Sequence, residues 1–236
     1  MKLFPPLQNW KLLERLTQLF GFNPAWYAGF GIPGHNGWDL KAKYGEPVLA
    51  MHDGYIQRIE KNDISAGNNI KLYANNNSFG SAYLHLSKFN DIMVAQQIKA
   101  GQIIGFAGNS GGVRPPPTPS CPECGTHLHI GIFVPGRINE YKCYVDPAPR
   151  LFNEGDRLPY KLVNDLWILS RGDDVSFLQT CLKLEFPELP FEPISYFGNQ
   201  TRNAVSRFQQ KYLLSPTAGY CGPKTRRVLN QRYSAY

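Results

Sequence analysis

The amino-acid sequence predicts an antiparallel β domain followed by a small all-α domain of three helices. Two observations predict this fold class. Between about Gly31 and Pro135, short apolar alternations are broken by Gly, Asn and Pro, whereas beyond Asp173 apolar residues recur at helical spacing. Turn residues at such short intervals favour antiparallel strands over alternating strand, helix and strand units. We therefore place the first domain at 1–148, a linker at 149–165 and the second domain at 166–236.

Five segments of the first domain show the alternation that is typical of strands. Each is followed by turn residues at short spacing. The segments are 47–60, 68–77, 81–89, 102–112 and 126–134. Ahead of them, apolar residues recur at helical spacing between Trp10 and Phe20, which predicts a helix that packs on the sheet.

Three helices are predicted for the second domain. The first covers Asp173 to Lys183 and has an aspartate as a natural N-cap, and the second runs from about Gln200 to Tyr212. The third begins at Gly222 and Pro223, because proline suits the first turn of a helix. The segment that follows Asp146 is rich in Pro, Asn, Asp and Gly without clear periodicity, which indicates the linker.

Charge and hydropathy narrow the classes of function. The 236 residues carry a formal net charge of +7, which favours anionic partners. The charge is spread along the chain without a run of five or six basic residues, so we do not expect nucleic-acid binding. No apolar stretch approaches the roughly 18 residues that cross a bilayer, so we expect no membrane span. Pro5 and Pro6, with charged residues soon after, interrupt the N-terminal segment, and we expect no secretion signal there.

Two histidines share one face of the strand predicted at 126–134. His127 and His129 alternate with Leu128 and Ile130, so the imidazoles point one way and the apolar side chains point into the core. Two imidazoles held side by side on a rigid strand suit a metal ligand beside a catalytic group.

Two further motifs carry side chains of the kind that bind zinc. His35 and Asp39 lie four residues apart among glycines, which makes a turn entering a strand more plausible than a helix, and His85 lies on a predicted strand. One aspartate and two histidines form a suitable zinc set, and three protein ligands leave a position open for catalysis. Each motif alone is a weak signal, because a single histidine is more often structural, but their combination favours a site. His52 precedes Asp53 and Gly54, which indicates the start of a turn, so His52 is not included in the predicted site.

The five cysteines are an odd number, so at least one thiol is free in a monomer. Cys121 and Cys124 lie in the proline-rich stretch 113–124, which we expect to form one wall of the cleft. They could pair with each other or with Cys143. A second zinc is the alternative, but these three cysteines lack an obvious fourth ligand, which favours a disulfide or free thiols. Cys181 continues an apolar helix face and is expected to be a small buried residue.

Successive motifs of the first domain resemble those of the lysostaphin and LytM-type metallopeptidases. The resemblance covers roughly Leu16 to Pro147 and rests on GHNGWDL, GEPVLAMHDGYI, YLHLSKF, GQIIGFAGNSG and THLHIGIF. It implies a sheet of the duplicated-hybrid-motif type that cleaves peptide cross-links of peptidoglycan. One zinc ion would be bound by His35, Asp39 and His129, while His85 and His127 would be the catalytic histidines. We expect His127 to be the general base and His85 to stabilise the oxyanion or orient groups, and these two roles could be exchanged.

The second domain resembles the three-helix peptidoglycan-binding domain that is often attached to wall hydrolases. Taken singly, the positions that carry the resemblance are mostly core and cap positions; they include Gly172, Asp174, Val175, Leu178, Gln179, Leu182, Phe197, Gly198, Thr201, Val205, Phe208, Gln209, Gly219, Gly222, Thr225 and Leu229. The resemblance implies bacterial peptidoglycan as the partner. A tethered binder would raise the concentration of the peptidase at the wall.

The rival predictions come from other functional classes. A non-catalytic wall-binding or regulatory protein would keep the peptidase fold without activity, but the ligand and histidine sets are complete. A zinc carboxypeptidase would need a different ligand pattern. We expect a monomer that acts at the cell wall. It would either accumulate in the cytoplasm and be released, as a bacteriolytic phage endolysin is, or be secreted with its leader removed.

Overall fold

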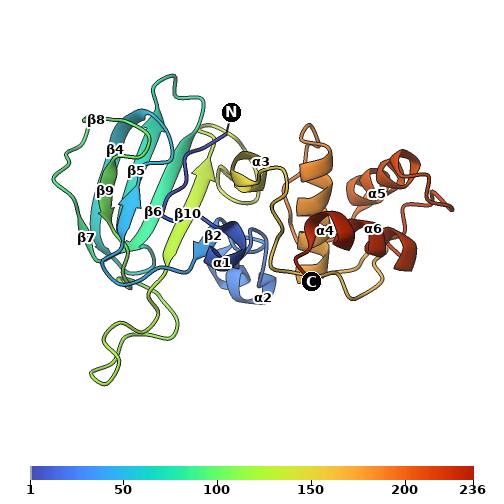
Figure 1. Ribbon diagram of the computed structural model, residues 1–236, viewed down its shortest axis with the longest axis horizontal. Coiled ribbons are helices and arrows are strands. Elements are labelled where there is room, and N and C mark those ends of the chain that lie inside the picture. The colour runs from blue at the N-terminus through green and yellow to red at the C-terminus, as the bar shows by residue number, and fades with distance from the viewer. Residues whose placement is uncertain (1) are drawn as a thin grey trace. The chain divides into compact units, whose positions relative to one another are not determined.

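The computed structural model describes residues 2–236, which fall into two compact units (Figure 1). The first unit contains the described residues up to Thr17 together with Gly37–Val145, and the second contains Gln18–Asn36 together with Asp146–Tyr236. The division of the chain at residues 148 and 165 stays a prediction. The contacts nevertheless assign residues 18–36 to the unit that includes the C-terminal helices.

An antiparallel sheet of eight strands is the larger sheet of the first unit, and its central strands lie side by side in Figure 1. The strand order is β1, β2, β10, β6, β5, β4 and β8, and β11 pairs with β10 beside this path. The strands are β1 (Leu16–Gln18), β2 (Trp38–Leu40), β4 (Gly54–Asp63), β5 (Gly67–Ala74), β6 (Gly80–Leu86), β8 (Gln97–Ile98), β10 (Leu128–Phe133) and β11 (Tyr144–Val145). The antiparallel sheet confirms the fold class predicted for this part of the chain.

A second sheet has three strands in the order β3, β9 and β7, which cover Pro47–Leu49, Ile103–Phe106 and Lys88–Phe89. The apolar positions of the alternating segments form the core of the unit. Their side chains are excluded from solvent, which is the main favourable term for this fold; the fully buried ones include Trp38, Leu40, Val48, Ile56, Ile70, Leu72, Tyr83, Leu86, Ile104, Leu128, Ile130 and Ile132.

The helix predicted between Trp10 and Phe20 is wrong for most of its length. Only α1 (Leu12–Arg15) is helical, and from Leu16 the backbone is extended and enters β1. Edge pairing explains the difference, because the Arg15 carbonyl accepts the Lys41 N–H at 2.6 Å and β1 lies beside β2. A short isolated helix gains little, whereas a strand gains hydrogen bonds from the sheet.

Three helices lie at the C-terminal end of the second unit, as predicted. They are α4 (Asp173–Glu185), α5 (Asn199–Lys211) and α6 (Pro223–Tyr233), and their first residues lie within one position of the predicted starts (Figure 1). The unit also contains α3 (Ala148–Leu151) and, from the earlier segment, α2 (Pro24–Tyr27) and the 3₁₀ turn η1 (Ala28–Phe30).

Two glutamines repeat the same contacts in successive helices. Gln179 of α4 donates to the Tyr196 carbonyl and the Thr201 hydroxyl and accepts the Ile194 N–H. In the same way, the side chain of Gln209 in α5 binds the backbone of residues 219 and 220 and the hydroxyl of Thr225. Each buried amide therefore fixes the loop that leads into the next helix.

The cysteines follow one of the alternatives that the sequence left open. Cys121 and Cys124 form a disulfide in the proline-rich loop, whereas the thiols of Cys143, Cys181 and Cys221 are free. Cys181 is fully buried, as expected, and burial raises its pKa well above the ordinary value. Within residues 2–236, helices long and apolar enough to cross a membrane are absent.

Candidate metal centre

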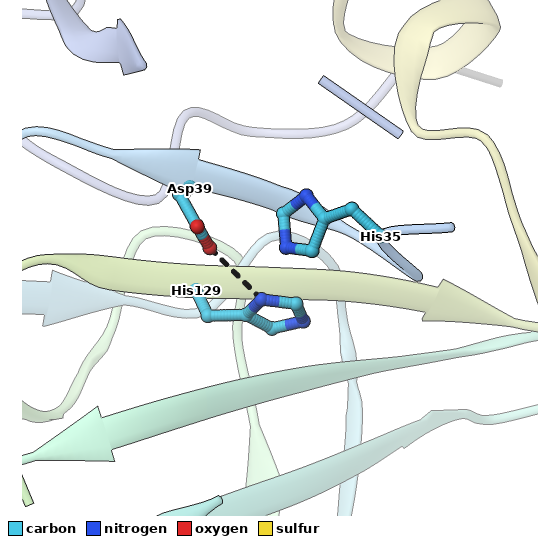
Figure 2. A group of neighbouring side chains, drawn as sticks. All are labelled: His35, Asp39 and His129. Carbon is cyan, nitrogen blue, oxygen red and sulfur yellow. Dashed lines mark hydrogen bonds and ion pairs between the residues drawn. The ribbon is translucent and has the colours of Figure 1, made fainter. Parts of the chain in front are cut away.

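Strand pairing places Asp39 beside His129. The two residues are register partners in the antiparallel pair formed by β2 and β10. Asp39 Oδ1 lies 3.0 Å from His129 Nδ1, and Figure 2 shows this contact as a dashed line. His129 is nearly excluded from water, with 5% of its surface exposed. Strand β2 therefore brings the Asp39 carboxylate close enough to the His129 imidazole for both to bind one metal ion.

Main-chain hydrogen bonds hold His35, which is fully buried. Its N–H donates to the Phe22 carbonyl at 2.9 Å, and its own carbonyl accepts the Gly21 N–H at 2.8 Å. The ring atom Nδ1 lies 3.1 Å from the Leu19 carbonyl. Because a carbonyl only accepts, Nδ1 carries the proton in the neutral ring and the lone pair lies on Nε2, the atom that can bind a metal ion.

His35, Asp39 and His129 together form a possible metal site. Each offers one ligand atom, and these atoms all lie within 4.8 Å of one another (Figure 2). Two imidazoles and one carboxylate fit zinc, and three protein donors leave room for a water or a substrate oxygen. The donor set that the sequence predicted is therefore brought together.

Gly37 permits the close approach of its segment to β10. A Cβ atom at this position would lie 2.6 Å from His129 Nε2 and would also collide with the Ile130 carbonyl. A larger residue would therefore displace either the strand backbone or the imidazole.

Two further imidazoles lie beside this group. The rings of His85 and His127 have centroids 4.6 Å apart, and the His85 ring lies 6.2 Å from that of His129. His127 Nε2 lies 3.7 Å from Asp39 Oδ1. His85 belongs to β6, which pairs directly with β10, so neighbouring strands bring these residues together.

Backbone carbonyls fix the tautomers of both rings. His85 Nδ1 lies 2.9 Å from the Ser110 carbonyl, and His127 Nδ1 lies 2.8 Å from the Gly125 carbonyl. Each Nδ1 therefore donates, which leaves Nε2 as an acceptor in the neutral ring. The sequence analysis missed Ser110 and Gly125, because a main-chain carbonyl has no sequence signature.

His85 is held in an unfavourable backbone conformation and in a poorly solvated place. Its φ angle is +61°, in the left-handed region that residues other than glycine seldom adopt. Burial, helped by the neighbouring His127 and His129, lowers the pKa of His85 from 6.5 to about 3. The ring is therefore neutral at physiological pH.

His52 lies outside the metal group, as the sequence predicted. Its Nε2 lies 2.9 Å from the Ser81 hydroxyl and its Nδ1 lies 2.9 Å from the Asp53 carbonyl. His52 is buried, and these two contacts indicate a structural role.

The model of Peptidase family M23 matches residues 33–143, which include all five residues of the centre. These residues form a peptidase family M23 domain. M23 is a metallopeptidase family with peptidoglycan endopeptidases among the relatives of this chain. A second match, to a putative peptidoglycan binding domain, covers residues 171–229, which include α4, α5 and the first seven residues of α6.

Relatives of the M23 domain are endopeptidases of several kinds. Lysostaphin from Staphylococcus simulans is 33% identical over 145 residues, or 61% of this chain and 26% of that protein. The glycyl-glycine endopeptidase ALE-1 of Staphylococcus capitis is 38% identical over 99 residues, covering 42% and 27% of the two chains. The peptidoglycan DD-endopeptidase ShyA of Vibrio cholerae is 34% identical over 115 residues, covering 48% and 24%.

Among solved structures, the catalytic domain of lysostaphin from Staphylococcus simulans matches with a TM-score of 0.47 and 29% identity. The match covers 62% of this chain and 96% of that domain. The chain spans only about a quarter of the length of the curated relatives named above.

Proposed function

We propose that this protein is a zinc-dependent endopeptidase that hydrolyses peptide cross-links of bacterial peptidoglycan. The observation that carries the proposal is the cluster of three zinc-type ligand atoms within 4.8 Å of one another, beside two further imidazoles, in an M23 domain. His35, Asp39 and His129 would hold a single zinc ion. Bound there, zinc would polarise the scissile carbonyl and lower the pKa of the attacking water.

His127 is proposed as the general base. Its Nε2 carries the lone pair, because Nδ1 donates to the Gly125 carbonyl, and the same atom lies 3.7 Å from Asp39. It is therefore aimed toward the ligand group and can accept a proton from water there.

His85 is proposed to assist by orienting groups and stabilising the oxyanion. Its Nε2 is likewise an acceptor in the neutral ring, so it donates to an oxyanion only after taking up a proton. The ring contact with His127 supports the participation of both histidines in one reaction. In the alternative assignment, His85 is the general base and His127 orients groups and stabilises the oxyanion.

Peptidoglycan is proposed as both substrate and binding partner. The match to a peptidoglycan binding domain supports attachment to the wall, which would raise the local concentration of the peptidase. The relatives are named for different bonds, including a glycyl-glycine and an L-Ala–D-Glu bond, so the cleaved bond has to be measured.

The setting proposed for this activity is the bacterial cell wall, with the protein acting as a monomer in a bacteriolytic, endolysin-like role. The pairing of an M23 domain with a peptidoglycan binding domain supports action on intact wall. Lysis of living cells by added protein would support the bacteriolytic role, and unchanged turbidity would contradict it.

The decisive experiment compares the protein with His35→Ala on purified sacculi of several wall types. Mass spectrometry of the released fragments should find new amino termini with the wild-type protein alone, which would also identify the bond. Metal content should fall in His35→Ala. Binding to sacculi without release of peptide from any wall type would instead support a non-catalytic wall-binding protein.

A further inference from the structure

The main chain of residues 19–22 holds His35 in place. Two backbone hydrogen bonds join His35 to Gly21 and Phe22, and the carbonyl of Leu19 accepts from the imidazole. Gly34, next to the histidine, approaches Gly21 so closely that a Cβ there would collide with the Gly21 carbonyl. The position of the imidazole therefore depends on where residues 19–22 lie.

Two buried hydroxyls of the same compact unit bind this segment. Ser176 of α4 and Ser195 lie 2.8 and 2.6 Å from the Gly21 carbonyl oxygen, and their own oxygens lie 2.6 Å apart. Both serines are at most 3% exposed. Because the two hydroxyls carry two protons, two of these three contacts are made at any one time. The close fit extends to Gly21, where a Cβ would lie 2.8 Å from Ser176 Oγ.

A second attachment lies one turn away. The Asn23 N–H donates to Asp173 Oδ1 at 2.9 Å, at the first residue of α4. The Phe22 ring packs edge to face on Tyr160, with centroids 4.9 Å apart. Hydrogen bonds and ring packing thus tie residues 21–23 to the part of the chain that carries the C-terminal helices.

We propose that Ser176 and Ser195 are positioning residues for the metal ligand His35, so that metal affinity depends on the C-terminal part of the chain. The proposal rests on the proposed function, because it takes His35 to be a ligand. The M23 match begins at residue 33, so residues 19–23 and both serines lie outside it. An outer contact of this kind acts by holding a ligand in its binding geometry before the metal arrives.

The test measures zinc affinity of the full chain by competition with a chromophoric chelator. Ser176→Ala with Ser195→Ala should weaken zinc binding about tenfold, near the lower end of the roughly 10- to 100-fold range for outer partners of metal ligands. The matched control is Ser206→Ala, since Ser206 follows Val205 in α5 as Ser176 follows Val175 in α4, and its hydroxyl binds the Thr217 carbonyl. The control should stay within about twofold of wild type.

If the double variant fails to fold, two less disruptive variants test whether the attachment of residues 21–23 affects zinc affinity. Asp173 is partly exposed, so Asp173→Ala removes the acceptor for Asn23 without opening a core, and Asp173→Asn keeps an acceptor oxygen. We expect weaker zinc binding in the alanine variant and recovery in the asparagine variant, with circular dichroism unchanged in both.

His35→Ala separates this proposal from the proposed function. If His35→Ala loses zinc while the serine and Asp173 variants bind zinc as wild type does, the positioning role is wrong and the ligand assignment stands. If His35→Ala binds zinc normally, both proposals are wrong.

Discussion

Main-chain carbonyls set the tautomers of the two imidazoles beside the candidate metal group. Each Nδ1 donates to a carbonyl, of Ser110 for His85 and of Gly125 for His127, so each Nε2 is free to accept. Side-chain identity was visible in the sequence, and the strand alternation placed His127 and His129 on one face. The tautomer of His85 depends on a carbonyl 25 residues further along the chain, and that of His127 on a carbonyl two residues before it in a turn. Neither contact could be predicted from the sequence.

Removal of one of the imidazoles proposed as catalytic should separate catalysis from metal binding. His85→Ala should keep zinc within about twofold of wild type and lower kcat by roughly 10²- to 10⁴-fold, the usual range for general acid–base or oxyanion groups. Zinc content and the rate of fragment release from sacculi are measured on the same preparation. A zinc-free His85→Ala protein would contradict the division between ligands and catalytic residues.

Gly37 should be intolerant of even one added methyl group. Gly37→Ala forces the new Cβ against the Ile130 carbonyl and to within 2.6 Å of His129 Nε2. We expect a lower melting temperature and weaker zinc binding, which differential scanning calorimetry and chelator competition measure. The control is Gly29→Ala, where a Cβ meets nothing within 4 Å. Equal zinc affinity in the two variants would show that the close approach is not needed.

Buried Asp146 should make stability depend on pH. It accepts hydrogen bonds from the Ala148 N–H and the Thr180 hydroxyl near the Lys183–Glu192 ion pair. Burial raises the pKa of Asp146 from 3.8 to about 7. The folded chain therefore binds more protons than the unfolded chain between about pH 4 and 7, so this group's contribution to stability falls as pH rises through that window.

Urea unfolding between pH 4.5 and 7.5 tests this sign. In Asp146→Asn the fall in stability toward pH 7 should be smaller than in the wild-type protein, because the asparagine does not titrate. Identical slopes in the two proteins would mean that Asp146 is not the titrating group.

At the scale of elements, the same set of glutamine contacts joins α4 to α5 and α5 to α6. Gln179 and Gln209 each follow an apolar residue by one position and bind the loop and the threonine of the next helix. The signal is present in the sequence as YFGNQTR at 196–202 and YCGPKTR at 220–226. Apolar spacing, an aspartate N-cap and a first-turn proline predicted where these helices begin. The contacts of the buried glutamine amides cross loops and could not be predicted in this way.

Loss of one glutamine should loosen the loop that it binds. Gln209→Ala leaves the Gly219 N–H and the Tyr220 carbonyl without this partner, at a cost of about 1–3 kcal/mol in the stability of the element. Hydrogen exchange of peptides that cover residues 213–222 should become faster. Gln210→Ala is the control, since Gln210 is exposed. Equal exchange in both variants would contradict the role of the buried amide.

The elements that sequence reasoning placed well are those whose apolar pattern is local. Strand β10 was predicted from alternation between imidazoles and aliphatic residues, and it lies at the centre of the site. The prediction of a helix between Trp10 and Phe20 failed because sheet pairing from Leu16 onward outweighs helical spacing. The assignment of residues 18–36 to the unit with the C-terminal helices depends on contacts about 150 residues apart, such as Asn23 with Asp173.

At the scale of the whole molecule, the net charge of +7 should assist binding to an anionic wall. Binding of the His35→Ala variant to sacculi should decrease at least about threefold between 50 and 500 mM NaCl, because salt screens charges over shorter distances. A pull-down with quantification of the unbound protein measures this, with uncharged chitin as the control polymer. Salt-independent binding would show that uncharged contacts dominate.

The chain passes from one compact unit to the other after Thr17, after Asn36 and after Val145. A hybrid enzyme made by joining a foreign wall-binding module after residue 145 would separate residues 18–36 from their partners, Ser176 among them. An exchange that preserves those partners must carry residues 18–36, and with them His35, into the new protein. In this chain, the wall-binding part and residues 18–36 are therefore expected to be exchangeable only as one piece.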